Sequence, residues 1–143
     1  MSEPVSTPKP PARAELVWEH DLVFSGKSGD VALTVDSTST EGPSPMQALA
    51  FGLLGCMAMD VLHVIQKGRY PLRGLRADFL GERAPEEPRR YTAITLHFSV
   101  TGEVPDEKVE RAIALSREKY CSVWHSMRQD IDLKTTFTVT AGV

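Results

Sequence analysis

A run of twelve apolar residues, 48–59, constrains the fold of this chain more than any other segment. The run follows Ser44-Pro45-Met46-Gln47, which has the pattern of a capping box with proline at the first helical position. Gly68 supplies a stop signal, so the pattern predicts a helix over residues 45–67 whose first half is apolar on every face. A membrane span needs about 20 apolar residues, and the uninterrupted apolar run has only twelve. We therefore expect a buried core helix and not a membrane helix.

Shorter segments on either side alternate between apolar and polar residues, as half-buried strands do. Residues 14–24 and 31–35 predict a hairpin around a turn at 25–30, and residues 72–83 and 90–101 predict a second hairpin. A helix beginning at Pro105, a short helical piece at 123–127 and a last strand at 131–140 follow. The order β-β-α-β-β-α-β predicts an α+β fold, with a curved antiparallel sheet packed against the long central helix.

The long helix has more apolar surface than one small sheet can cover. We therefore expect a second copy of the chain to cover it, in an obligate homodimer. The 143 residues fit a single domain, predicted over residues 14–143. Residues 1–13 are polar and rich in proline, so we expect a flexible leader there and neither a secretory signal nor a membrane anchor.

The net charge of −3 argues against nucleic acid as the main partner, because duplex binding needs a clustered excess of Lys and Arg. Without an export signal we expect the protein in the reducing cytoplasm. In that compartment a structural disulfide is disfavoured, and cysteines serve chemistry, metal binding or packing.

The chain has two cysteines, Cys56 inside the apolar run and Cys121 near the end of the second predicted helix. Cys56 lies about three turns from the predicted helix start, beyond the reach of the helix dipole, so a reactive thiolate there needs a cation from elsewhere in the chain or from a second subunit. We expect Cys121 at a semi-exposed turn, a place suited to resolving a sulfenic acid. For each cysteine, simple packing is the alternative, and the spacing does not show that the two touch.

The histidines do not indicate a metal site. His20, His63, His97 and His125 are scattered, and neither a Cys-x-x-Cys nor a His-x-x-x-His pair is present. No glycine-rich phosphate loop or nucleophilic-serine motif is found either. We expect neither a metal nor a cofactor.

Residues 42–49, continuing through Leu54-Gly55-Cys56, resemble the Pro-x-Glu-Leu-Leu…Leu-Gly-x-Cys helix of the OsmC/Ohr family of thiol peroxidases. Residues 81–84, 94–100, 107–112 and 118–123 are similar to the rest of that family, and the resemblance covers about residues 18–139. It implies an OsmC-like fold and an intertwined homodimer with active sites at the subunit interface. It also implies reduction of organic hydroperoxides and hydrogen peroxide, in defence against oxidative stress.

The same resemblance implies roles for individual residues. Cys56 would attack the peroxide O–O bond and become a sulfenic acid, and Cys121 would condense with it to a disulfide that an external thiol reduces. The family's glutamate corresponds to Gln47, and its arginine comes from the N-terminal hairpin, which carries no arginine after Arg13 here. Lys27 is the candidate substitute, so Gln47 and Lys27 are the predicted supporting residues.

Three functions remain open at this stage. The first is a cytoplasmic thiol-dependent peroxidase that uses Cys56 and Cys121. The second is a dimeric binding protein for a small apolar ligand, with the cysteines as pocket lining or as a redox switch, and Gln47 in place of the family's glutamate favours it. A disulfide-exchange protein is disfavoured because no Cys-x-x-Cys pair exists.

Overall fold

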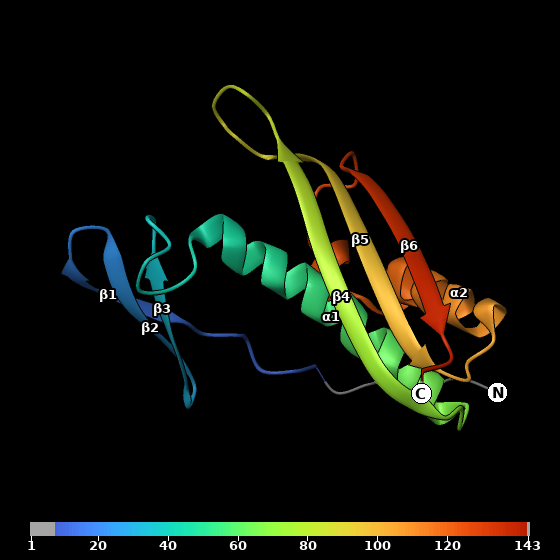
Figure 1. The fold of residues 1–143 in the computed structure, drawn as a ribbon. Coiled ribbons are helices and arrows are strands. Elements are labelled where there is room, and N and C mark those ends of the chain that lie inside the picture. The colour runs from blue at the N-terminus through green and yellow to red at the C-terminus, as the bar shows by residue number, and fades with distance from the viewer. Residues whose placement is uncertain (1–7, 143) are drawn as a thin grey trace. The chain divides into compact units, whose positions relative to one another are not determined.

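The computed structural model describes residues 8–142 (Figure 1). Its contacts divide the chain between Ala48 and Leu49 into two compact units. The elements in order are β1 (Glu15–His20), β2 (Val23–Ser28), β3 (Val31–Asp36), α1 (Pro45–Lys67), β4 (Leu72–Arg83), β5 (Tyr91–Gly102), α2 (Asp106–Leu115), the π-helical turn η1 (Ser116–Tyr120), α3 (Ser122–His125) and β6 (Asp132–Thr140).

The predicted leader over residues 1–13 lies partly outside the described residues, which begin at residue 8. Residues 8–14 form no helix or strand and are exposed. The single domain over residues 14–143 stays a prediction.

The N-terminal unit contains a three-stranded antiparallel sheet in the order β1-β2-β3. The predicted strand over residues 14–24 is wrong, because the chain turns back after His20. Asp21 adopts a positive φ of 46°, which Asp tolerates better than most residues, and its carbonyl accepts the Trp18 indole N–H at 2.8 Å. The hairpin of the prediction is therefore a three-stranded sheet.

The turn predicted at residues 25–30 is also wrong, because residues 25–28 belong to β2. Gly26 lies inside that strand, where an added Cβ would meet the Leu33 carbonyl oxygen at 2.8 Å. The turn itself is confined to Gly29 and Asp30, and Gly29 has the positive φ of 58° that glycine adopts freely. Gly26 thus allows the neighbouring strand to approach closely, and Gly29 allows the turn.

A buried carboxylate folds the loop that follows β3. Asp36, only 2% exposed, accepts hydrogen bonds from the backbone N–H groups of Glu41, Thr38 and Thr40 at 2.9–3.2 Å. These donors lower the pKa of Asp36 to about 2. The loop leads to α1, whose start carries the predicted capping box.

The C-terminal unit contains a second sheet in the order β4-β5-β6. β4 and β5 pair antiparallel as predicted, but β6 runs parallel to β5. The chain crosses back through α2, η1 and α3 between those two strands, and a parallel pair requires such a crossover. The α+β class is confirmed, while the all-antiparallel sheet is replaced by two sheets and one parallel pair.

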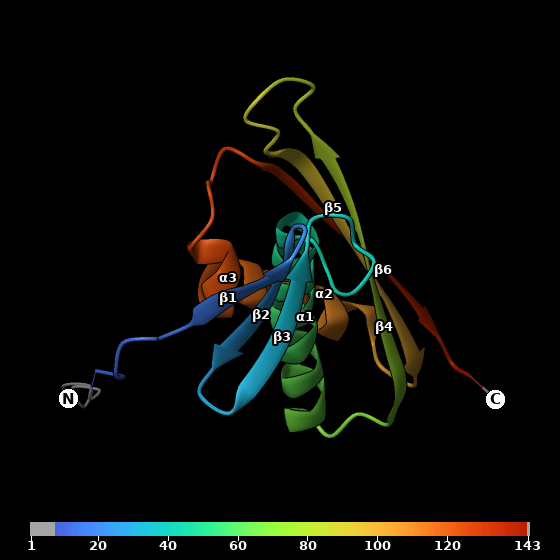
Figure 2. The ribbon, with the colours of Figure 1, turned by 90° about the vertical axis from the view of Figure 1, so that its left-hand side faces the viewer.

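The helices of the C-terminal unit cover one face of this second sheet (Figure 2). The alternation predicted for β5 is confirmed, since its even-numbered apolar residues from Ile94 to Val100 are at most 1% exposed. Every fourth residue of α1 from Leu53 to Ile65 and three residues of α2 are buried with them. This core includes Leu53, Met57, Val61 and Ile65 of α1 and Val109, Ala112 and Ile113 of α2.

Helix α1 has the predicted bounds. Within one chain only a stripe of it is buried, and Phe51 and Met59 are 68% and 71% exposed. An 18-residue window of α1 has a mean hydropathy of 2.0 with 22% of its residues buried. By length and composition α1 could therefore cross a membrane, which the twelve-residue run alone did not show; the core helix of a soluble protein meets the same criterion.

Candidate functional site

The fold brings the two cysteines together in the C-terminal unit. Cys56 is half-buried in α1, and Cys121 is fully buried between η1 and α3. Both are free thiols, and Cys56 lies close enough to Cys121 to help raise the pKa of the Cys121 thiol. The contact that the sequence spacing left open is therefore present.

An irregular turn places Cys121 at this contact. The N–H of Cys121 donates to the Ser116 carbonyl, five residues back, at 2.8 Å, which continues the π-helical pattern of η1. Cys121 then caps α3, where its Sγ accepts the Trp124 N–H at 3.3 Å. The predicted semi-exposed position is wrong, since Cys121 is 0% and Trp124 4% exposed. The segment folds into the core instead of turning at the surface.

Burial raises the pKa of the Cys121 thiol to about 11. The Trp124 N–H acts in the opposite direction, because it donates to the sulfur and favours the thiolate. The neighbouring Cys56 favours the protonated form again. At neutral pH Cys121 is thus a neutral thiol whose S–H can donate to the Cys56 sulfur.

A hydrogen bond between two polar side chains lies beside the cysteines. The hydroxyl of Ser116, which is 0% exposed, donates to Asp60 Oδ2 at 2.7 Å. Asp60 follows Cys56 by one helical turn on the same face of α1. The sequence did not predict this pair. Asp60 is the first charged residue after the apolar run, which is the only signal for it, and no pattern marks Ser116.

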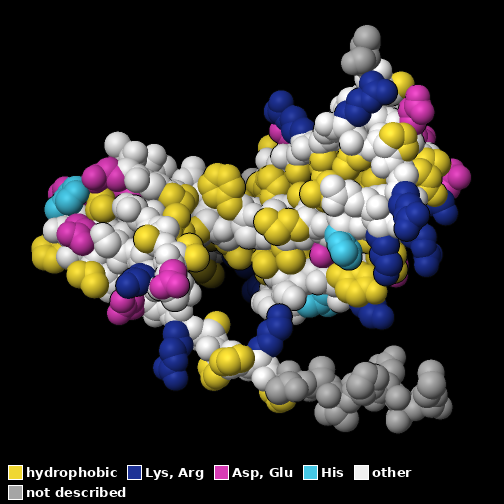
Figure 3. Space-filling model, turned by 90° about the horizontal axis from the view of Figure 1, so that it is seen from below, with side chains coloured by type: hydrophobic (Ala, Val, Ile, Leu, Met, Phe, Trp, Pro, Cys, Tyr) yellow, Lys and Arg dark blue, Asp and Glu magenta, His cyan; other side chains and the backbone are white. Residues whose placement is uncertain are grey.

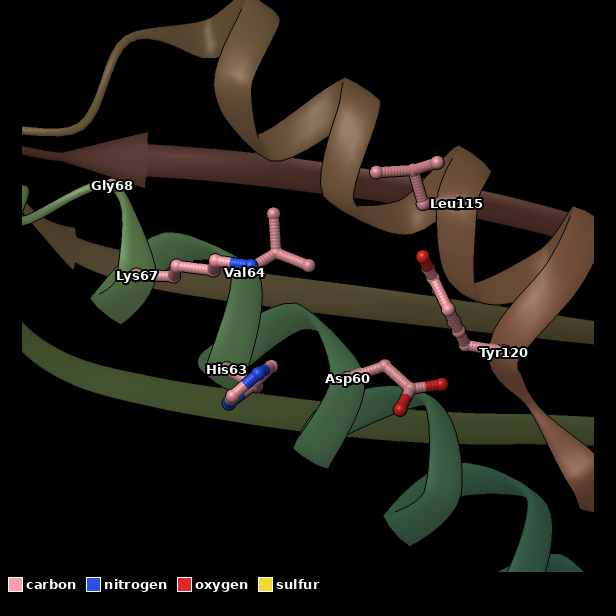
Figure 4. A pocket seen from close by; sticks show the side chains of 7 residues that line it. All are labelled: Asp60, His63, Val64, Lys67, Gly68, Leu115 and Tyr120. Carbon is pink, nitrogen blue, oxygen red and sulfur yellow. The ribbon is translucent and has the colours of Figure 1, made fainter. Parts of the chain in front are cut away.

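A cavity of about 490 Å³ extends from this bond along α1 (Figure 4). Asp60, His63 and Lys67 come from α1, and Tyr120 comes from the opposite wall directly before Cys121. Val64 and Leu115 supply apolar surface, and Gly68 completes the lining. The volume and the mixed lining suit a small amphipathic molecule.

Gln47, the first predicted supporting residue, belongs to the cap of α1. Its Oε1 accepts the Ser44 N–H at 3.0 Å, and the Ser44 hydroxyl oxygen accepts the Gln47 N–H at 3.1 Å. The predicted capping box is confirmed. Gln47 lies in the N-terminal unit, whereas both cysteines lie in the C-terminal unit.

Lys27, the second predicted supporting residue, lies in β2 and not in a turn. It is exposed and pairs in register with Glu15 of β1. It lines a groove of about 380 Å³ together with Arg13, also in the N-terminal unit. Of the four predicted site residues, the two cysteines are the pair that the structure brings into contact.

The histidines take part in other contacts. His125, four residues after Cys121, is exposed and its Nε2 contacts the Arg117 carbonyl oxygen at 3.0 Å. His97 contacts the Thr136 hydroxyl oxygen at 2.7 Å on the sheet. Within residues 8–142, no three His, Cys, Asp or Glu side chains are grouped so that they could hold a metal ion.

Comparison with known proteins adds a family and a fold. Residues 37–136 match the family model described as OsmC-like protein. The chain is 36% identical to Protein YhfA of Escherichia coli K12 over 133 residues, which cover 91% of this chain and 99% of that protein.

Two solved structures illustrate the similarity of the fold. A hypothetical protein from Aquifex aeolicus VF5 superposes with a TM-score of 0.84 at 27% identity, covering 92% of this chain and 97% of that one. An organic hydroperoxide resistance protein OsmC from Legionella pneumophila superposes with a TM-score of 0.69 at 16% identity, covering 93% and 100% of the two chains. At 16% identity the second comparison shows a shared fold.

Proposed function

Because the chain belongs to the OsmC-like family, we propose that it is a thiol-dependent peroxidase that reduces organic hydroperoxides and hydrogen peroxide. The observation that carries the proposal is the proximity of two free thiols, one half-buried and one fully buried, which interact closely enough to shift the Cys121 pKa. A protein of the same fold is named for resistance to organic hydroperoxides, which supports the substrate class.

The different environments of the two cysteines support a division of roles. An external peroxide can approach Cys56, which is half-buried, but not Cys121, which is 0% exposed and carries a pKa of about 11. In the first step the Cys56 sulfur attacks one peroxide oxygen and the O–O bond breaks. A sulfenic acid forms, and an organic hydroperoxide leaves as its alcohol or hydrogen peroxide as water. The neutral Cys121 thiol can stabilise the attacking thiolate by donating its S–H.

Cys121 then resolves the sulfenic acid. Its sulfur bonds to the Cys56 sulfur, and the sulfenic hydroxyl leaves as water together with the Cys121 proton. Two equivalents of an external thiol reduce the disulfide and become a disulfide themselves, which restores both cysteines. The cycle needs no metal or cofactor, and we place it in the reducing cytoplasm, where thiol reductants are available.

The cation that favours the Cys56 thiolate is part of the proposal. Lys27 is the candidate, and Arg13 lines the same groove in the N-terminal unit. Gln47 cannot supply an ion pair, and its side chain is engaged in the cap of α1. Lys27→Met is therefore expected to slow peroxide reduction, whereas Gln47→Glu should keep the cap.

We also propose a homodimer in which a second copy covers the exposed face of α1. In Figure 3 hydrophobic side chains gather in a band over this helix, and Phe51 and Met59 are the most exposed of its large apolar residues. Leaving such a patch in water is unfavourable, which supports a protein partner. Light scattering should give the mass of two chains, and a mass of one chain in wild type would contradict the proposal.

Peroxide consumption tests the function directly. We expect the wild-type protein with a thiol reductant to consume cumene hydroperoxide, and Cys56→Ser to lose this activity down to the background rate. Cys121→Ser should complete one turnover and leave a sulfenic acid on Cys56 that a dimedone probe traps. Ser122→Ala, an exposed neighbour of Cys121, serves as the control and should behave as wild type. Intact thiols in wild type after peroxide treatment would refute the proposal.

The second candidate function is a binding protein for a small amphipathic ligand. The cavity of about 490 Å³ lined by Asp60 and Tyr120 favours it, because its lining combines charged and apolar side chains. Cys56→Ser discriminates between the two functions, since it should leave ligand affinity nearly unchanged while it abolishes peroxide reduction.

A further inference from the structure

We propose that Asp60 and Ser116 form a positioning pair that holds the buried Cys121 against Cys56. The proposal deepens the proposed function, and its kinetic consequence rests on that function. Its equilibrium consequence, the stability of a Cys56–Cys121 disulfide, does not require peroxidase activity.

Ser116 is connected to both sides of the thiol contact. Its carbonyl accepts the Cys121 N–H at 2.8 Å, and its hydroxyl donates to Asp60 Oδ2 at 2.7 Å. Asp60 in turn lies one helical turn beyond Cys56 on the same face of α1. A chain of two hydrogen bonds and one helical turn therefore runs from Cys121 to the backbone that carries Cys56.

The burial of Ser116 makes this chain of contacts specific. Ser116 is 0% exposed and is one of two buried polar or charged residues in the described part of the chain. A hydrogen bond from a buried hydroxyl to a carboxylate is charge-assisted and stronger than a neutral one. Removing either partner leaves a polar group without its bond, so the pairing of Ser116 with Asp60 is strongly favoured over other arrangements.

The irregular backbone next to Ser116 explains why such a connection is needed. η1 is a π-helical turn, and α3 after Cys121 has only four residues. Neither element is long enough to be stable alone. The position of the Cys121 sulfur is therefore fixed only if the whole segment is fixed. The link to α1 fixes the segment to the longest helix of the molecule.

The consequence concerns what happens to oxidised Cys56. A sulfenic acid either condenses with Cys121 and releases water, or meets a second peroxide and becomes a sulfinic acid. Condensation is favoured when Cys121 is held in contact. The Asp60 and Ser116 pair therefore raises the effective concentration of one thiol at the other and protects Cys56 from over-oxidation.

The first test is the equilibrium between the cysteine pair and glutathione. Two protein thiols and one oxidised glutathione give the Cys56–Cys121 disulfide and two reduced glutathiones, and mass spectrometry after acid quenching and alkylation counts the species. We expect Ser116→Ala and Asp60→Ala each to lower this equilibrium constant about tenfold, the effect of losing one hydrogen bond to a charged group. Asp60→Asn keeps a carbonyl oxygen for the Ser116 hydroxyl and should restore most of the loss. Ser122→Ala is the control and should match wild type.

The double variant Ser116→Ala with Asp60→Ala separates positioning from general destabilisation. If the two residues act through one bond, the double variant should lose no more than either single variant. Two results would overturn the proposal: single variants that stay within about twofold of wild type, or losses that multiply in the double variant. If Ser116→Ala does not fold, the Asp60→Ala and Asp60→Asn pair decides the question alone, because Asp60 is only partly buried.

The second test follows peroxide treatment of the same variants. The ratio of sulfinic acid on Cys56 to disulfide should rise about tenfold in Ser116→Ala and Asp60→Ala. A raised ratio supports the positioning role, and an unchanged ratio contradicts it. Wild-type protein that does not react with peroxide would refute the proposed function alone, and the glutathione equilibrium would still decide the positioning role.

Discussion

The segments that carry the two cysteines differ in almost every respect. Cys56 lies in the middle of a regular helix of 23 residues and is half-buried, whereas Cys121 lies between a π-helical turn and a four-residue helix and is fully buried. The regular helix leaves its cysteine partly accessible, and the irregular segment encloses its own. The surroundings therefore give the two cysteines different accessibility to solvent.

We expect the largest loss of stability from a substitution that opens the irregular segment around Cys121. The Trp124 side chain is 4% exposed and packs in the core, and the backbone N–H of Trp124 donates to the Cys121 sulfur. Trp124→Ala should lower the free energy of unfolding by about 3–5 kcal/mol through the cavity that it leaves. Urea denaturation measures this loss. At pH 8 without denaturant, alkylation of Cys121 should also be faster in Trp124→Ala than in wild type.

The exposed neighbour His125 provides the control for that experiment. His125→Ala should cost less than about 0.5 kcal/mol, as surface substitutions do, and should leave Cys121 unreactive. If Cys121 is alkylated equally fast in wild type and in Trp124→Ala, the Trp124 side chain does not protect this thiol.

Two methionines of α1 test how much the regular helix that carries Cys56 contributes to stability. Met57 is 0% exposed and Met59 is 71% exposed in one chain. Met57→Ala should cost about 2–5 kcal/mol of unfolding free energy. Met59→Ala should cost less than about 0.5 kcal/mol if the chain is a monomer, and more if a second copy covers this face. Thermal unfolding at several protein concentrations distinguishes these outcomes.

Alkaline pH tests the buried thiol. Burial raises the pKa of Cys121 from 9.0 to about 11, so its contribution to stability is complete below pH 9 and is lost as the pH rises through about 11. We expect the unfolding free energy of wild type to fall by up to about 3 kcal/mol more than that of Cys121→Ala over this range. Urea denaturation at a series of pH values gives both curves, and parallel curves would contradict the raised pKa.

We expect the smallest loss of stability from the caps at the starts of α1 and α3. The Ser44 hydroxyl caps α1, and the Cys121 sulfur caps α3. Ser44→Ala should cost about 1 kcal/mol of unfolding free energy, since Gln47 loses the acceptor for its N–H. Ser122→Ala, exposed at the start of α3, is the matched control and should cost less. Equal losses in calorimetry would show that the capping box contributes nothing to α1.

Elements with a strong local pattern could be predicted from the sequence. The capping box and the apolar run gave the bounds of α1, and strict alternation gave the buried face of β5. The N-terminal sheet was harder, because Gly26 and its serine neighbours have the composition of a turn. What keeps them in a strand is pairing with β1 and β3, a property of the sheet and not of the segment.

The candidate site could be predicted only in part. The two cysteines were selected by their number and setting, but the exposure of Cys121 was wrong, because a π-helical turn has no sequence signature that reveals which way the next residue points. Gln47 was identified as a capping residue from its spacing to Ser44, and the structure confirms that bond. Lys27 was placed in a turn only because the strand around it was not recognised.

The sequence by itself determined the long helix with its cap, the α+β class, the family and the two thiols, because each depends on residues close together in the chain. The tertiary structure decided the parallel strand β6, the burial of Cys121 and its contact with Cys56. It also decided the bond between Asp60 and Ser116, which are 56 positions apart. Contacts of that kind depend on how whole elements pack, and no local periodicity records them.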